Sequence, residues 1–334
     1  MRYVPSEHIK KGMIIALPIM ADNGSVLVNS GLPISDAVIR HVNTMGIQGV
    51  YIEEAGFEDI IVEDILPQRI KNAAYDALMQ GDYDLCVSIA KEMVREIKSL
   101  RNKTINLIDL KSFKNYEYHH CVSVAMYAIC LGYALKMTDE QVDNLAVAGI
   151  LHDIGKFDVK KRVLNTKQIY NDKQMDEMMK HPMYSYEELK DYTSVSSVSR
   201  NAVLFHHENL DGSGYYKITA DKLGIAPRIL RIIDTYDALT ATRRQRAAFS
   251  PAVSFKIIVK DAGKIYDKEL VRTFIKTFPM YPIGYTVRLS HDVYAVVVSQ
   301  TDDMERPIVR TFSGEEINLH KDTSYKGIKI EDKL

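Results

Sequence analysis

The stretch from Thr138 to Lys156, TDEQVDNLAVAGILHDIGK, organises the middle of this 334-residue chain. Thr138 and Gln141 have the spacing of a capping box, which predicts that a helix starts here. Apolar residues then recur at spacings of three and four, the period of a helix with one buried face. The helix is therefore expected to end near His152 and Asp153, with these polar side chains turned away from solvent.

Further side chains of the kind that bind metals occur on both sides of this stretch. Six of the ten histidines lie between residues 119 and 207, where even spacing along the chain would place about 2.7. Imidazole and carboxylate groups together suit divalent iron, manganese or zinc. Seven such groups are more than one ion can use, which predicts a two-metal site. The candidates are His120, His152, Asp153, His181, His206, His207 and Asp234.

The composition is that of an ordinary folded protein with a length of roughly two domains. The chain is 46% apolar and 26% charged, with 43 basic and 44 acidic side chains. This balance argues against binding to a nucleic-acid polymer. Cys86, Cys121 and Cys130 have no CxxC spacing, so a reducing, cytoplasmic setting is expected. No apolar run reaches about 18 residues, which predicts no membrane insertion.

Residues 1–65 are predicted to form a small α+β module. Asp22-Asn23-Gly24 is a strong hairpin-turn signal between two apolar runs. The expected elements are strands at Met13–Leu17 and Val26–Val28, a helix at about 34–45 and a strand at Val50–Ile52. The module is interpreted as regulatory, with dimerisation or the covering of an apolar face as alternatives.

Residues 66–334 are predicted to form the main domain, with a helical core at about 100–265. Tyr285–Leu289 and Tyr294–Val298 have the composition of strands, so a β-rich tail is expected over 270–334. The predicted fold class is therefore mainly α. It consists of a helical bundle with a small N-terminal α+β module and a short β-rich C-terminal appendage.

Two long motifs carry a resemblance to a known family. His152-Asp153-Ile154-Gly155-Lys156, followed by HHENLDGSGY at 206–215, resembles the signature of HD-GYP proteins. These are the bacterial cyclic-di-GMP phosphodiesterase branch of the HD phosphohydrolase superfamily, so the resemblance implies an HD-type bundle. The likeness covers about 110 to 310 and includes His120–Ala125, His181-Pro182 and Asp234–Thr240.

The resemblance also implies a role for each matching position. The seven candidates become ligands of two divalent ions, Fe or Mn, and Asp153 bridges the pair. Such a pair clamps a phosphodiester while a bridging hydroxide attacks phosphorus, which makes Asp153 and Lys156 the catalytic residues. Lys156 would also stabilise charge on the phosphate. The implied substrate-binding residues are Lys156, Tyr215, Arg243, Arg246 and Asp211.

Some positions depart from the family pattern. Tyr216 replaces the proline of the GYP motif, which removes a φ constraint from the loop. Tyr116 stands where some members carry a glutamate for a third metal, which favours two ions. His119 is interpreted as structural, since it points away from its neighbour on a helix. Glu208 is interpreted either as a group that orients an imidazole or as a surface charge.

Three functions are compatible with these residues. The leading hypothesis is hydrolysis of cyclic di-GMP to linear pGpG, with or without a further step to GMP. The altered GYP loop keeps open a second substrate, cyclic GMP-AMP or another nucleotide. The third hypothesis is a non-catalytic cyclic-dinucleotide sensor or adaptor. A homodimer or a signalling-protein partner is compatible with each of them.

Overall fold

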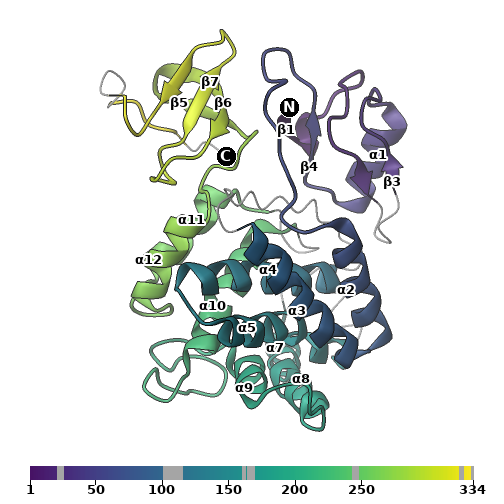
Figure 1. Ribbon diagram of the computed structural model, residues 1–334, viewed down its shortest axis with the longest axis vertical. Helices are drawn as coiled ribbons and strands as arrows, with labels where there is room; N and C mark the ends of the chain where they lie inside the picture. The colour runs from purple at the N-terminus through teal and green to yellow at the C-terminus, as the bar shows by residue number, and fades with distance from the viewer. Residues whose placement is uncertain are drawn as a thin grey trace.

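A computed structural model describes residues 1–20, 26–100, 116–159, 163, 170–242, 248–322 and 327–331 of the chain. Figure 1 shows a helical body, with the N-terminal elements and the C-terminal strands placed above it in this view. The predicted fold class, mainly α with small sheets, is confirmed. Within the described ranges, no helix has the length and apolar character needed to cross a membrane. The predicted turn at Asp22-Asn23-Gly24 lies outside them.

The helical body is built around a close pair, α4 (Tyr116–Ala134) and α5 (Asp139–Leu151). A Cβ on Gly149 of α5 would lie 2.7 Å from the Cα of Ala125 on α4, so only glycine permits this approach. The predicted capping box of Thr138 and Gln141 starts α5. Around the pair lie α2 (Gln68–Gln80), α3 (Tyr83–Ser99), α7 (Asp172–Met178), α8 (His181–Leu189), α9 (Ser197–Phe205), α10 (Ile225–Thr240), α11 (Pro251–Lys260) and α12 (Lys268–Thr277).

The N-terminal elements form two short antiparallel pairs and one helix. The structure contains β1 (Arg2–Pro5) paired with β4 (Gly49–Ile52), β2 (Ile19–Met20) paired with β3 (Val26–Val28), a 3₁₀ turn at Ser6–His8 and α1 (Asp36–Met45). The strand predicted at Met13–Leu17 was wrong. Ile15 donates to Leu32, and the carbonyl of Ile14 accepts from Glu53, so this segment divides its backbone bonds between different neighbours.

The C-terminal strands form one antiparallel sheet in the order β5-β6-β7-β8. Helix α12 extends past residue 270, so strands begin only at Thr286. The two predicted strands are present, joined by a turn in which His291 has a φ of 68°. The strands are β5 (Thr286–Leu289), β6 (Val293–Ser299), β7 (Ile308–Thr311) and β8 (Glu316–Asn318), with a 3₁₀ turn at Ser290–Asp292.

The N-terminal elements contact both the sheet and the helical body. Tyr3 stacks on Tyr285 with ring centroids 4.4 Å apart, and its backbone N–H donates to Gly284 at 2.8 Å. Gln48 donates to the backbone carbonyl of Thr240, at the end of α10, at 2.8 Å. Helix α10 also carries Asp234 and Asp237, so the N-terminal elements contact a helix that supplies two acidic side chains to the candidate metal site.

Candidate metal centre

Three buried histidines are held in the same way at the ends of helices. His152 follows α5, His206 follows α9, and His181 begins α8 directly after α7. The carbonyls in the last turn of a helix have no partner within that helix. Each histidine donates Nδ1–H to such a carbonyl, which leaves Nε2 with a free lone pair. The Nδ1–O distances are 2.8 Å for His152 with Gly149, 2.7 Å for His181 with Met178 and 2.6 Å for His206 with Val203.

His120 lies in the first half of α4, where it cannot use an unpaired helix-end carbonyl. Its Nδ1 instead lies 2.6 Å from Oδ2 of Asp237 on α10, and both side chains are fully buried. Its Nε2 lies 3.1 Å from Oδ1 of Asp234, one turn earlier on α10. Asp237 was not predicted as a site residue. Its spacing of three from Asp234, which places both on one helix face, is the signal that could have found it.

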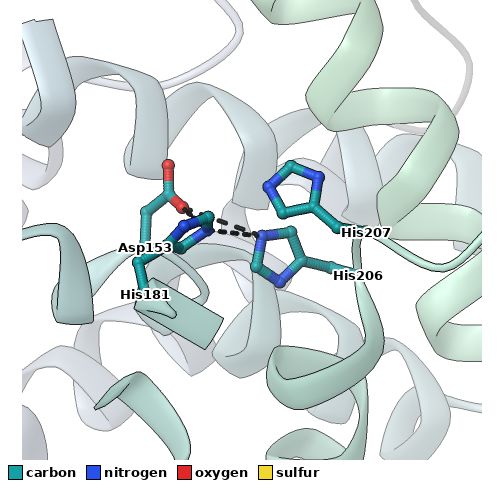
Figure 2. Close-up of side chains that lie close together, drawn as sticks. All are labelled: Asp153, His181, His206 and His207. Atoms are coloured by element: carbon teal, nitrogen blue, oxygen red, sulfur yellow. Dashed lines mark hydrogen bonds and ion pairs between the residues drawn. The ribbon is translucent and has the colours of Figure 1, made fainter. Parts of the chain in front are cut away.

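Asp153 stands between two groups of histidines. Its Oδ2 lies 3.3 Å from Nε2 of both His120 and His152. Its Oδ1 lies 3.1 Å from Nε2 of His181 and 3.7 Å from that of His206. Figure 2 shows this second group, in which the rings of His206 and His207 approach from one side and His181 lies beside Asp153. Two clusters of potential ligand atoms therefore share one carboxylate.

The donor set fits metal ions. Nε2 of His120 faces that of His152 at 3.3 Å, and Nε2 of His181 faces that of His206 at the same distance. Where both Nε2 atoms of a pair are unprotonated, their lone pairs face each other, an arrangement that a bound cation would stabilise. All four rings are buried and lie away from bulk water.

The electrostatics of the site divide its histidines into two groups. Burial alone would lower the pKa of both His120 and His152, but Tyr116 and the surrounding carboxylates raise that of His120 well above its usual range, and Asp153 raises that of His152 to about 10. Burial lowers the pKa of His206 and of His207 well below its usual range, which keeps both rings neutral. Burial alone would raise the pKa of Asp153, but His152 and Lys156 hold it well below its usual range. His207 completes the set, with Nδ1 at 3.7 Å from Oδ2 of Asp234. The seven predicted ligands thus lie together, and their role stays a prediction.

The short turn after Asp153 is tied to the helix that carries His181. Oγ of Ser185 on α8 accepts from the backbone N–H of Gly155 and donates to the carbonyl of His152, both at 2.9 Å. Lys156 lies in the 3₁₀ turn Ile154–Phe157, and its Nζ contacts Oδ2 of Asp153. The ammonium group of Lys156 therefore lies beside the carboxylate that the two histidine groups share.

The predicted substrate-binding residues fall in different places. The ring centroid of Tyr215 lies 4.6 Å from that of His207, next to the histidines. Asp211 is exposed, and its Oδ1 accepts from the backbone and the hydroxyl of Ser213, so it shapes a turn. Arg243 and Arg246 lie outside the described residues. His119, interpreted as structural, packs on Tyr75 with ring centroids 4.3 Å apart.

Residues 97–270 match the HD domain family, and the chain therefore belongs to it. The resemblance to HD-GYP proteins is confirmed by the curated relatives, and a neighbouring structure shares the fold. That structure is Bd1817, a HDG"Y"P protein from Bdellovibrio bacteriovorus, with a TM-score of 0.51 and 14% identity. The match covers 81% of this chain and 97% of that one, and at this identity it shows a shared fold alone.

Curated relatives include enzymes acting on two cyclic dinucleotides. The cyclic di-GMP phosphodiesterase PA4108 of Pseudomonas aeruginosa is 32% identical over 63% of this chain and 52% of its own length. The cyclic di-GMP phosphodiesterase PdeB of Borreliella burgdorferi is 27% identical over 55% and 48%. The 3'3'-cGAMP-specific phosphodiesterase 3 of Vibrio cholerae is 29% identical over 54% and 39%. The chain spans about half the length of the first two relatives.

Proposed function

We propose that this protein is a metal-dependent phosphodiesterase that hydrolyses cyclic di-GMP to linear pGpG, with or without a further step to GMP. The observation that carries the proposal is the position of Asp153, whose two oxygens face two separate histidine groups. The names of PA4108 and PdeB support the substrate. A shared carboxylate between two sets of imidazoles is what a phosphodiesterase with paired ions requires.

Two divalent ions are proposed, one for each cluster. His120, His152 and Asp153 would hold one, and Asp153, His181, His206 and His207 the other. Asp234 lies between His120 and His207 and is proposed to contribute to either. Fe and Mn both accept this mixture of imidazole and carboxylate. Bound ions of this kind polarise a phosphodiester and lower the pKa of water.

The remaining residues bind and orient the substrate in this proposal. Lys156 presents a cation 12% exposed at the edge of the centre, suited to a phosphate oxygen. Tyr215 would line the site beside His207 and contact the dinucleotide. From the family resemblance, Arg243 and Arg246 are proposed to hold the second phosphate, and Asp211 to shape the loop that carries Tyr215.

A second substrate is supported by one comparison. A 3'3'-cGAMP-specific phosphodiesterase matches this chain at 29% identity, close to the value for PdeB. Cyclic GMP-AMP is therefore the alternative substrate, and Tyr216 in the GYP loop distinguishes this chain from the family pattern. A sensor or adaptor that binds a cyclic dinucleotide without turnover is the non-catalytic alternative.

Residues 1–65 are proposed to act as a regulatory module on the domain at 66–334. The bond from Gln48 to Thr240 supports this, because it connects the module to the helix that carries Asp234 and Asp237. A cytoplasmic setting and a homodimer or signalling-protein partner complete the proposal. Gln48→Ala should change turnover without changing metal content; equal turnover in the variant would argue against this route of regulation.

The proposed activity can be tested with protein purified without oxygen and reconstituted with Fe(II) or Mn(II). Cyclic di-GMP and cyclic GMP-AMP are supplied in parallel, and pGpG and GMP are followed by chromatography. Metal-dependent product that disappears in Asp153→Ala is expected. Absence of product from protein that holds two ions would overturn the catalytic proposal, and tight dinucleotide binding in that case would favour the sensor.

A further inference from the structure

Glu208 is a buried carboxylate that the proposed reaction does not use. It follows the His206-His207 pair and is only 1% exposed. Its Oε1 accepts a hydrogen bond from the backbone N–H of Tyr216, and its Oε2 accepts one from that of Ile218 at 2.9 Å. The surface-charge interpretation of this residue was wrong, because the side chain is buried, and within the described ranges no imidazole is among its hydrogen-bond partners. It bonds the backbone of the GYP loop.

The loop folds back tightly onto this carboxylate. A Cβ on Gly214 would lie 2.5 Å from Cα of Glu208 and 2.7 Å from its Oε2, so glycine alone allows the contact. Tyr215 stands between Gly214 and Tyr216, and its ring lies against His207. The main chain is thus fixed to Glu208 on both sides of Tyr215.

One of these bonds depends on the departure from the family motif. A proline at position 216 has no N–H, and its Cδ would occupy the place of that hydrogen, in contact with Oε1 of Glu208. The side chain of Tyr216 is not needed for the bond. What matters is that the residue is not proline.

We infer that Glu208 is a positioning residue, and that it fixes Tyr215 in the site through a hydrogen bond from the Tyr216 backbone that the family proline cannot donate. The inference deepens the proposed function, since Tyr215 matters there as a substrate contact. The bond itself concerns only the folded loop. It can therefore be tested even if the proposed substrates are wrong.

The first test uses trypsin on the metal-loaded protein. Lys217 is exposed, but the following peptide N–H, that of Ile218, is bonded to Glu208, so cleavage between them requires the loop to open. Glu208→Gln can accept only one of the two N–H groups. Cleavage at Lys217 should become about tenfold faster in Glu208→Gln and in Tyr216→Pro. This factor corresponds to the free energy of one hydrogen bond to a buried charge, which each variant loses.

Matched variants separate this bond from other effects. Glu187→Gln makes the same change in an exposed glutamate of α8, which is 53% exposed and pairs with Lys190, and should leave cleavage as in the wild type. Tyr216→Ala removes the ring but keeps the N–H, so it should open the loop less than Tyr216→Pro. In the double variant Glu208→Gln/Tyr216→Pro, cleavage at Lys217 should be little faster than in either single variant, because both substitutions remove the same hydrogen bond.

The second test compares KM and kcat for cyclic di-GMP. Displacement of Tyr215 should raise KM about tenfold in Glu208→Gln and Tyr216→Pro, with smaller change in kcat and with wild-type metal content. If the wild type shows no turnover, the same shift is expected in the Kd for cyclic di-GMP. Unchanged cleavage at Lys217 in both variants, or equal effects of Tyr216→Ala and Tyr216→Pro, would overturn the inference. Faster cleavage with unchanged KM and Kd would refute the positioning of Tyr215.

Discussion

Asp237 accepts a hydrogen bond from His120, with Oδ2 of the carboxylate 2.6 Å from Nδ1 of the imidazole. The three histidines at helix ends, His152, His181 and His206, donate to backbone carbonyls instead. A carboxylate behind a ligand histidine fixes its tautomer and raises its basicity more than a carbonyl does. His120 is therefore the histidine of this set whose metal affinity depends on a replaceable side chain.

Replacing Asp237 with Asn should weaken metal binding while leaving every proposed ligand in place. We expect the affinity for Mn(II) to fall roughly 10- to 100-fold, the range for such outer partners. Competition against a chelator, followed by metal analysis, measures it. Asp176→Asn, at an exposed position of α7, is the matched control and should bind as the wild type does. Equal affinities in the two variants would contradict this role for Asp237.

The positions of the proposed ligands were predictable because each belongs to a short, ordered motif. His152 was also expected at the end of a helix, and the capping box and period that predicted it are local signals. The partners of these residues were not predictable in the same way. Asp237 meets His120 across 117 positions of sequence, and only the packing of α10 on α4 brings them together.

The fold was predictable to a similar extent. Strand β5 alternates in burial, and β6 contains a continuous buried run, Ala295–Val297; both are visible in the sequence as apolar, β-branched stretches. The segment at Met13–Leu17 has the same apolar composition, but its backbone bonds several neighbours, which composition does not reveal. Helix α12 begins only two residues before position 270, where the β-rich tail was expected to start, with Asp267 as its N-cap.

Asp153 and Lys156 should respond differently to truncation. Asp153→Ala removes the carboxylate common to both histidine groups, so both metal content and turnover should be lost. Lys156→Ala removes only a cation beside that carboxylate, so turnover should fall by at least tenfold with metals retained. Metal analysis and product chromatography on the same samples separate the two. Lys180→Ala, at an exposed lysine, is the control, and loss of metal from Lys156→Ala would contradict its assigned role.

Ser185 should matter for stability. Ser185→Ala leaves the N–H of Gly155 and the carbonyl of His152 without their partner in a buried position. The expected cost is about 2 kcal/mol in the free energy of unfolding. Urea unfolding at fixed metal loading measures it, with Ser99→Ala as the control because that hydroxyl is exposed. A loss no larger than that of the control would show that the serine only fills space.

Asp59 and Arg310 join the N-terminal segment to the C-terminal sheet. Both terminal nitrogens of Arg310 lie 2.7 Å from the carboxylate oxygens of Asp59. Hydrogen bonds from Arg310 lower the pKa of Asp59 to about 2, from an ordinary 3.8. Because the folded-state pKa is the lower one, the stabilisation is complete above about pH 4 and is lost as the pH falls towards 2.

Asp59→Asn should therefore destabilise the protein in a pH-dependent way. The carboxylate is 63% exposed, so solvent screening limits the expected loss to about 1 kcal/mol at neutral pH. Urea unfolding of the wild type and the variant should give the same difference at pH 7 and pH 5, and a smaller one near pH 3. Asp302→Asn, at an exposed aspartate, should give no such trend. A difference that stays constant down to pH 3 would mean that the charge of Asp59 does not hold the two ends of the chain together, and that their contact rests on the apolar packing around Tyr3 and Tyr285.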